Sequence, residues 1–189
     1  IVPGFIDAHN HLIWAGDRFN EHNLRMQGHS YSEIAGMGGG IMQTVTSTRG
    51  RSDKELLSIG RTRLSEALRN GTTFVEAKSG YGLSTEHEVR LLSVVNQLKS
   101  EENLPSIHST WMGAHAVTPD QTYESYTEEI LSEQLPAVLD SRLAESADVF
   151  CEPGWFSIEQ SEDILRASRR GGLDLRMHVD EFVDGGGGE

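Results

Sequence analysis

Two histidines separated by one residue are the first candidates for chemistry in this sequence. His9 and His11 directly follow residues 1–8, an apolar run that predicts a β-strand. Alternate residues of an extended segment point to the same side, so both imidazoles could reach one metal ion. Neutral imidazole nitrogens suit Zn or Fe(II). The motif alone is also compatible with two solvent-exposed histidines at the end of a strand.

Four further strands are expected, and polar groups follow each of them. With the first, the expected strands cover residues 1–8, 72–78, 106–112, 147–151 and 173–177. The groups at their carboxyl ends are His9 and His11, then Lys78 and Tyr81, then His115, then Glu152, and last His178 and Glu181. Parallel strands bring their carboxyl ends to one face of a barrel or one edge of a sheet. Polar groups after all five strands therefore favour one shared site.

Some of these residues also have simpler interpretations. His115 could be a hydrogen-bonded core histidine, and Lys78 is expected mainly as an ion-pair partner of Glu76 or Glu152. Cys151 is interpreted as a buried small residue, because nothing near it in the sequence indicates an activated thiolate. The remaining histidines are interpreted as surface or packing residues: His22, His29, His87 and His108.

Amphipathic stretches of about four turns separate the expected strands. They predict helices at about residues 53–69, 85–99, 127–144 and 157–170. Capping boxes are expected at Ser52 with Glu55, Thr85 with Glu88, and Ser157 with Gln160. Pro136 removes one backbone hydrogen bond and predicts a kink in the third of these helices. Strands that alternate with helices indicate parallel βαβ units, in either a (β/α)8 barrel or a doubly wound sheet.

Composition narrows the class of protein. The 189 residues suffice for one domain with a substantial core. A formal net charge of −13 argues against a nucleic-acid partner, and no apolar run approaches the roughly 18 residues of a membrane helix. A single cysteine suits a reducing compartment. We expect a cytoplasmic protein without a membrane partner, and residues 1–189 look like a segment of a longer chain.

Several motifs of this sequence resemble a known family. Residues 3–11, PGFIDAHNH, resemble the first-strand signature of the amidohydrolase superfamily. A narrower resemblance, to the imidazolonepropionase family, runs in the family's order along essentially the whole chain. Its blocks are residues 15–18 (AGDR), 38–41 (GGGI), 44–45 (TV), 48–49 (TR), 78–83 (KSGYGL), 113–119 (GAHAVTP), 148–152 (DVFCE) and 178–182 (HVDEF).

The resemblance implies a fold and a metal site. The fold would be an α/β, (β/α)8 TIM-like barrel of the metal-dependent hydrolase type. Residues 1–189 would form about the first five βα units of this single catalytic domain. One Zn or Fe ion per chain would be bound by His9, His11 and His178. The family's last ligand is an aspartate of the eighth strand, which this sequence does not contain.

The resemblance also implies a reaction on a small molecule. This would be hydrolysis of the cyclic amide 4-imidazolone-5-propanoate to N-formimino-L-glutamate, in histidine breakdown, by a metal-activated water. Arg18 would bind the propionate carboxylate, and Tyr81 and His115 would hydrogen-bond the substrate. Glu181 would contact the imidazolone ring. Glu181 and His115 would be the catalytic residues.

Other functions remain open at this point. Binuclear amidohydrolases such as dihydroorotase bridge two metals with a carboxylated lysine on the fourth strand, but here that strand ends at Cys151 and Glu152. A mononuclear amidohydrolase or deaminase that acts on another small carboxylated heterocycle is an alternative, and Arg18 with Tyr81 favours a carboxylated substrate over a neutral base. A non-catalytic metal-binding barrel is a third. The oligomeric state stays open, with a homodimer as one option.

Overall fold

Five parallel strands form a single curved sheet in the computed structural model, which describes residues 1–30, 33–34 and 39–188. The strands are β1 (Phe5–Asp7), β2 (Thr72–Lys78), β3 (Ser106–Ala114), β4 (Ser146–Cys151) and β5 (Asp174–Val179). They lie in the order β1-β2-β3-β4-β5, so each strand pairs with its successor. Successive parallel neighbours are the order of a barrel, whereas a doubly wound sheet reverses direction part-way. The fold is therefore a partial TIM-like barrel.

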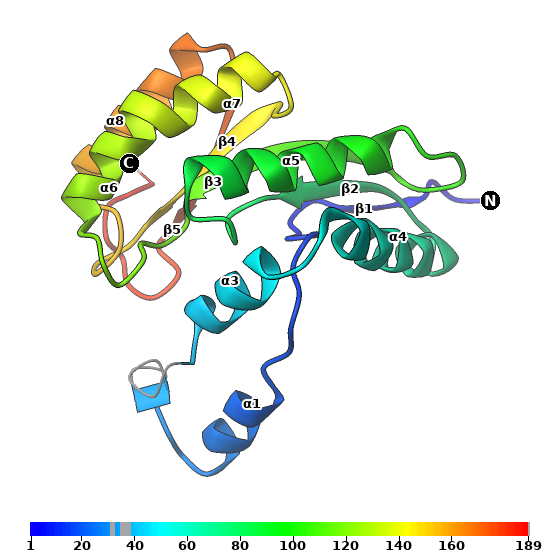
Figure 1. Cartoon of the computed structure of the whole chain (residues 1–189), viewed down its shortest axis with the longest axis horizontal. Helices are drawn as coiled ribbons and strands as arrows, with labels where there is room; N and C mark the ends of the chain where they lie inside the picture. Colours follow the sequence, from blue (N-terminus) through cyan, green and yellow to red (C-terminus); the bar gives the residue numbers. More distant parts are fainter. Residues whose placement is uncertain (31–32, 35–38, 189) are drawn as a thin grey trace.

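Helices cover the outer side of this sheet. They are α4 (Asp53–Arg69), α5 (Thr85–Lys99), α6 (Tyr123–Glu129), the π-helical segment η1 (Ile130–Gln134), α7 (Leu135–Ser141) and α8 (Ile158–Arg170). Figure 1 shows α4 and α5 along β2 and β3, with α6, α7 and α8 grouped near β4 and β5. Buried side chains such as Val75, Val95, Trp111 and Ile164 fill the layer between helices and strands. The apolar faces that the helices bury are thus what holds the strand ends in register.

Two of the three expected capping boxes are confirmed. The Ser52 hydroxyl accepts a hydrogen bond from the Glu55 amide, and the Glu55 carboxylate accepts one from the Ser52 amide. Ser157 and Gln160 make the same pair at α8. The box expected at Thr85 is wrong. The N-cap of α5 is Ser84, one residue earlier. The side chain four positions later, Glu88, is consequently turned into the protein.

The helix expected over residues 127–144 also differs from the prediction. It begins at Tyr123, where Thr122 and Ser125 form a capping box, and ends at Ser141. The irregular part is the π-helical turn η1, which precedes Pro136 rather than lying at it. A proline ring clashes with the carbonyl four residues earlier, here that of Ser132 within η1. The wider turn accommodates the proline, since π turns commonly mark such interruptions.

The described residues between β1 and α4 include helices that the sequence did not predict. These are α1 (Phe19–Met26) and α3 (Ile41–Arg49), and neither has a side-chain hydrogen bond at its N-cap. Figure 1 shows both helices extending away from the sheet. Gly40 caps α3 with a φ of 77°, a conformation that favours glycine. Gly38, part of the motif at residues 38–41, lies outside the described residues.

Residues 1–8 were expected as one strand, but β1 covers only Phe5–Asp7, because its pairing with β2 starts at the first residue of β2, Thr72. Phe5 and Ile6 are exposed on this outermost strand. Among the described residues, no helix has the length and apolar character to cross a membrane.

Candidate active site

One cleft of about 900 Å³ lies at the carboxyl ends of the strands. All seven residues that the sequence predicted for a site line it: His9, His11, Arg18, Tyr81, His115, His178 and Glu181. Aromatic side chains of Phe150, Trp155 and Phe182 form part of its wall. Parallel strands thus bring together residues that are up to 172 positions apart in the sequence.

His9 and His178 meet within this cleft. His9 follows β1 and His178 lies in β5, and their Nε2 atoms are 2.8 Å apart. The two rings pack edge to face with centroids 4.5 Å apart. Burial and the neighbouring His178 lower the pKa of His9. Two imidazoles from opposite ends of the sheet therefore point their outer nitrogens at the same place.

Asp148 holds the other side of the His178 ring. Its Oδ1 atom is 3.0 Å from His178 Nδ1, and its Oδ2 atom accepts a hydrogen bond of 2.6 Å from Lys78 Nζ. Burial acts to raise the pKa of Asp148, but His178 and Lys78 outweigh burial and lower it. An ionised carboxylate can only accept, so Nδ1 of His178 carries the hydrogen of this contact and Nε2 is the nitrogen that faces the cleft. A carboxylate behind a histidine is a common way to orient a metal ligand.

Lys78 is a buried ion-pair residue, as predicted, and of the two partners considered it pairs with Glu76. Its ammonium group lies between Asp148 and Glu76, the latter at 2.9 Å. Glu152 was the other expected partner. Its carboxylate instead accepts hydrogen bonds from the backbone amides of Glu181 and Phe182. Lys78 thus stabilises the Asp148 carboxylate, while Glu152 fixes the loop that follows β5.

His11 and His115 are held by backbone carbonyls of one loop. His11 Nδ1 donates to the Ser79 carbonyl at 2.6 Å, and His115 Nδ1 donates to the Gly80 carbonyl at 2.8 Å. Their rings stack 4.7 Å apart, and the Tyr81 ring lies 4.9 Å from His11. Burial lowers the pKa of His11 well below its usual value and that of His115 to about 4. Both rings are therefore neutral at physiological pH, with a lone pair on Nε2.

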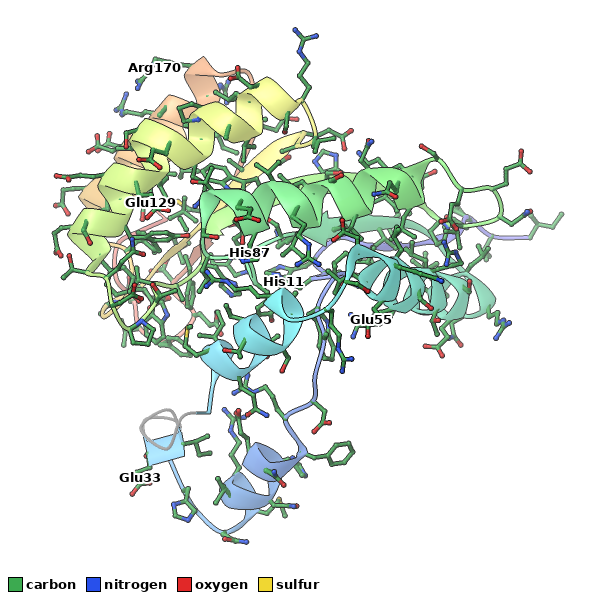
Figure 2. All side chains as sticks on the ribbon, in the orientation of Figure 1. His11, Glu33, Glu55, His87, Glu129 and Arg170 are labelled. Atoms are coloured by element: carbon green, nitrogen blue, oxygen red, sulfur yellow. The ribbon has the colours of Figure 1, made fainter. Side chains whose placement is uncertain are left out.

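The metal site that the resemblance implies can be compared with these contacts. Within the described residues, no three His, Cys, Asp or Glu side chains converge closely enough to hold a metal ion. The donor chemistry nevertheless fits. Nε2 of His9 and of His178 meet at 2.8 Å, and Ser79 leaves Nε2 of His11 as the unprotonated nitrogen. Neutral imidazoles fixed by second partners are suitable ligands for Zn or Fe. Figure 2 shows His11 near the centre of the molecule, whereas Glu33 and Arg170 lie at its margins.

Arg18 reaches the cleft from the start of α1. Its guanidinium pairs with Glu21, with Nε 2.6 Å from Glu21 Oε2. Burial acts to raise the pKa of Glu21, but hydrogen bonds from Arg18 and from the Gly40 amide outweigh burial and lower it. Glu21 thus ties Arg18 to the start of α3. Arg25, which the sequence did not single out, also lines the cleft.

Sequence comparison finds relatives along the whole chain. The chain is 47% identical to an imidazolonepropionase of Shewanella sediminis (strain HAW-EB3) over 189 residues, 99% of this chain and 46% of the relative. It is 44% identical, over the same shares, to imidazolonepropionases of Shewanella loihica (strain ATCC BAA-1088 / PV-4) and Shewanella putrefaciens (strain CN-32 / ATCC BAA-453). Similarity to imidazolonepropionases over nearly the whole chain supports that family. The chain spans about half the length of these relatives. No family model matches it.

The sequence analysis missed the contacts of Asp148, which lies behind His178, and of Glu152, which lines the cleft. Both lie in a block that carries the resemblance, yet neither received a role from it. A signal for Asp148 did exist. It is a carboxylate within a strand whose neighbours, Ala147 and Val149, are apolar and buried. Such a residue is rarely tolerated unless it is paired.

If the cleft binds the metal that the resemblance implies, replacing Asp148 by asparagine should weaken that binding in the full-length protein about 10- to 100-fold, the usual effect of losing such an outer partner. Asparagine loses the charge that Lys78 and the His178 ring face. Competition with a chromogenic chelator measures this. Asp174→Asn, an exposed change in β5, serves as the control and should leave the affinity unchanged. Equal affinities in a folded Asp148→Asn protein would show that Asp148 does not orient His178.

Proposed function

We propose that the protein containing this chain hydrolyses 4-imidazolone-5-propanoate to N-formimino-L-glutamate, with one Zn or Fe ion bound in the cleft. The observation that carries the proposal is that the three expected metal ligands line the same cleft as the expected substrate-binding residues. The ligands are His9, His11 and His178, and the others are Arg18, Tyr81 and Glu181. The name of the relatives supports the same substrate. It is transferred here as a proposal, because the chain spans 46% of their length.

His9, His11 and His178 would hold the metal. When bound, such an ion lowers the pKa of a coordinated water to about 7 and so supplies a nucleophile at neutral pH. Ser79 and Asp148 hold Nδ1 of His11 and of His178, so that Nε2 is the nitrogen offered in each ring. In this arrangement His11 and His178 would bind the metal through Nε2.

The remaining cleft residues would bind the substrate. The planar guanidinium of Arg18 suits a bidentate contact with the propionate carboxylate. His115 keeps its hydrogen on Nδ1, against the Gly80 carbonyl, and is neutral with a pKa of about 4. Its Nε2 atom would therefore accept a hydrogen bond, for example from a ring N–H of the imidazolone.

Glu181 would move protons. It lies just after β5, on a segment whose amides are bound by the buried carboxylate of Glu152. This anchoring fixes the backbone of Glu181 at the cleft while its side chain stays exposed. A carboxylate so placed is a candidate to transfer a proton to the leaving nitrogen when the cyclic amide opens.

A single metal ion is favoured over two. A binuclear site would need a carboxylated lysine, and β4 ends at Cys151 without one. Lys78, in β2, has its ammonium group engaged by Glu76 and Asp148. A mononuclear deaminase or another amidohydrolase for a small carboxylated heterocycle is the second candidate, because Arg18 and the three histidines would serve it as well.

Turnover of imidazolonepropionate by the purified full-length protein is the direct test. We expect the ultraviolet absorbance of the imidazolone to disappear while N-formimino-L-glutamate accumulates in equal amount. A deaminase would instead release ammonia from its substrate. A non-catalytic barrel would bind metal without consuming imidazolonepropionate. Either of these results would refute the proposed function.

A further inference from the structure

Glu88 is a fully buried carboxylate that the reaction described above does not use. It lies in the first turns of α5 and has no exposed surface. No ion pair within the described part of the chain involves it. Burial raises the pKa of the Glu88 carboxyl, while hydrogen bonds from the Ser79 side chain and from nearby amides act against this rise. A carboxylate buried without a cation requires other partners.

Backbone amides of the loop after β2 are those partners. Oε1 of Glu88 accepts hydrogen bonds from the amides of Gly82 at 2.7 Å and of Leu83 at 3.0 Å. The Gly80 amide lies 3.1 Å from Oε1 and 3.0 Å from Oε2. Three amides that converge on one carboxylate form an anion-binding nest. Glu88 therefore binds three backbone amides of the turn formed by residues 79–83.

The same loop holds three residues of the cleft. The carbonyls of Ser79 and Gly80 accept the Nδ1 hydrogens of His11 and His115, and Tyr81 is the next residue of the loop. The amides of this loop thus face Glu88, while two of its carbonyls face the cleft. The Glu88 carboxylate and the two histidines are therefore hydrogen-bonded to the backbone of the same loop.

The loop conformation needs such support. Gly80 has a φ of 102° and Leu83 a φ of 48°, both in the left-handed region that is unfavourable for a residue with a side chain. A Cβ atom at Gly80 would lie 2.8 Å from His115 Nδ1. Leu83 keeps this conformation while its amide is bound by Glu88. Backbone held in sparsely populated regions persists when its surroundings determine it.

We propose that Glu88 is a positioning residue, which sets His11, Tyr81 and His115 in the cleft through the amides of Gly80, Gly82 and Leu83. The inference rests on the proposed function for the roles of these three residues. Glu88 is not needed to start its own helix, because Ser84 caps α5 and accepts the His87 amide. Its removal should therefore change the cleft rather than the start of α5.

Glu88→Gln in the full-length protein tests this, with Glu86→Gln as the matched control. Both changes remove one carboxylate from the first turns of α5, but Glu86 is exposed. We expect Glu88→Gln to weaken Zn binding about 10-fold and to lower kcat/KM about 10- to 100-fold, as lost outer-shell contacts commonly do. Glu86→Gln should match the wild type. A merely structural role would lower the melting temperature and leave metal affinity and kcat/KM per folded molecule unchanged, which would overturn the proposal.

A measurement on the wild type keeps the proposal testable if Glu88→Gln fails to fold. The amides of Gly80, Gly82 and Leu83 should exchange with solvent deuterium as slowly as those of the neighbouring core strands, and fast exchange would contradict the nest. The Zn-affinity and exchange measurements need no turnover. If the wild type binds Zn but leaves imidazolonepropionate intact, the proposed function fails while the role of Glu88 is still decided by these two measurements.

Discussion

His178→Ala in the full-length protein should lose most of its bound metal and at least about three orders of magnitude in kcat/KM, on the order of 4 kcal/mol at about 1.4 kcal/mol per decade. The reason lies in the contacts of this ring. His178 Nε2 lies 2.8 Å from His9 Nε2, and Asp148 holds the opposite nitrogen. Alanine removes the imidazole and leaves the buried Asp148 carboxylate with Lys78 as its remaining charged partner.

Elemental analysis together with turnover measures this effect. His22→Ala is the control, because His22 is an exposed histidine in α1 that does not line the cleft. It should keep the metal content and the rate of the wild type. Equal metal content in the His178 and His22 variants would remove His178 from the metal site.

Arg18→Ala should lower kcat/KM about 30- to 4,000-fold. Losing a charge-assisted contact typically costs about 2–5 kcal/mol when the partner is left unpaired. Two consequences follow from the structure. The propionate loses its guanidinium, and Glu21, which is 5% exposed, loses the cation that Arg18 provides. Steady-state kinetics with imidazolonepropionate measure the loss, which should fall mainly on KM if Arg18 binds the substrate before and during the reaction alike.

Arg18→Lys separates the two consequences. Lysine keeps a positive charge near Glu21 but loses the planar fork that fits a carboxylate. We expect this variant to retain the stability of the wild type and to show most of the kinetic loss. Wild-type kinetics in Arg18→Ala would place the anion site elsewhere, with Arg25 as the next residue to test, because it lines the same cleft.

The parts of the fold that could be predicted are those that local chemistry determines. Capping boxes predict where α4 and α8 begin, because both partners of a capping box lie within four residues of the sequence. The pairs are Ser52 with Glu55 and Ser157 with Gln160. The same rule failed at α5. A start one residue earlier places Glu88 at the fourth helical position, where it points inward. A shift of one residue thus converts an expected capping residue into the centre of a buried nest.

The candidate site also has parts that could be predicted from the sequence and parts that could not. The positions of the cleft residues could be predicted, because parallel strands bring their carboxyl ends together whatever the details of packing. The supporting contacts could not, because they join distant residues. Asp148 meets Lys78 across 70 positions, and Arg18 depends on the unpredicted helix α1 to meet Glu21. Neither α1 nor α3 begins with a side-chain cap from which the helix could have been predicted.

The most direct test of the central claim is a metal titration of the stripped full-length protein with turnover of imidazolonepropionate as the readout. The account predicts that hydrolysis is absent after chelation, returns in proportion to added Zn or Fe, and reaches its maximum at about one ion per chain. The 2.8 Å approach of His9 Nε2 to His178 Nε2, with His11 in the same cleft, supports one such ion. Full hydrolysis without metal, or a maximum only at two ions per chain, would contradict it.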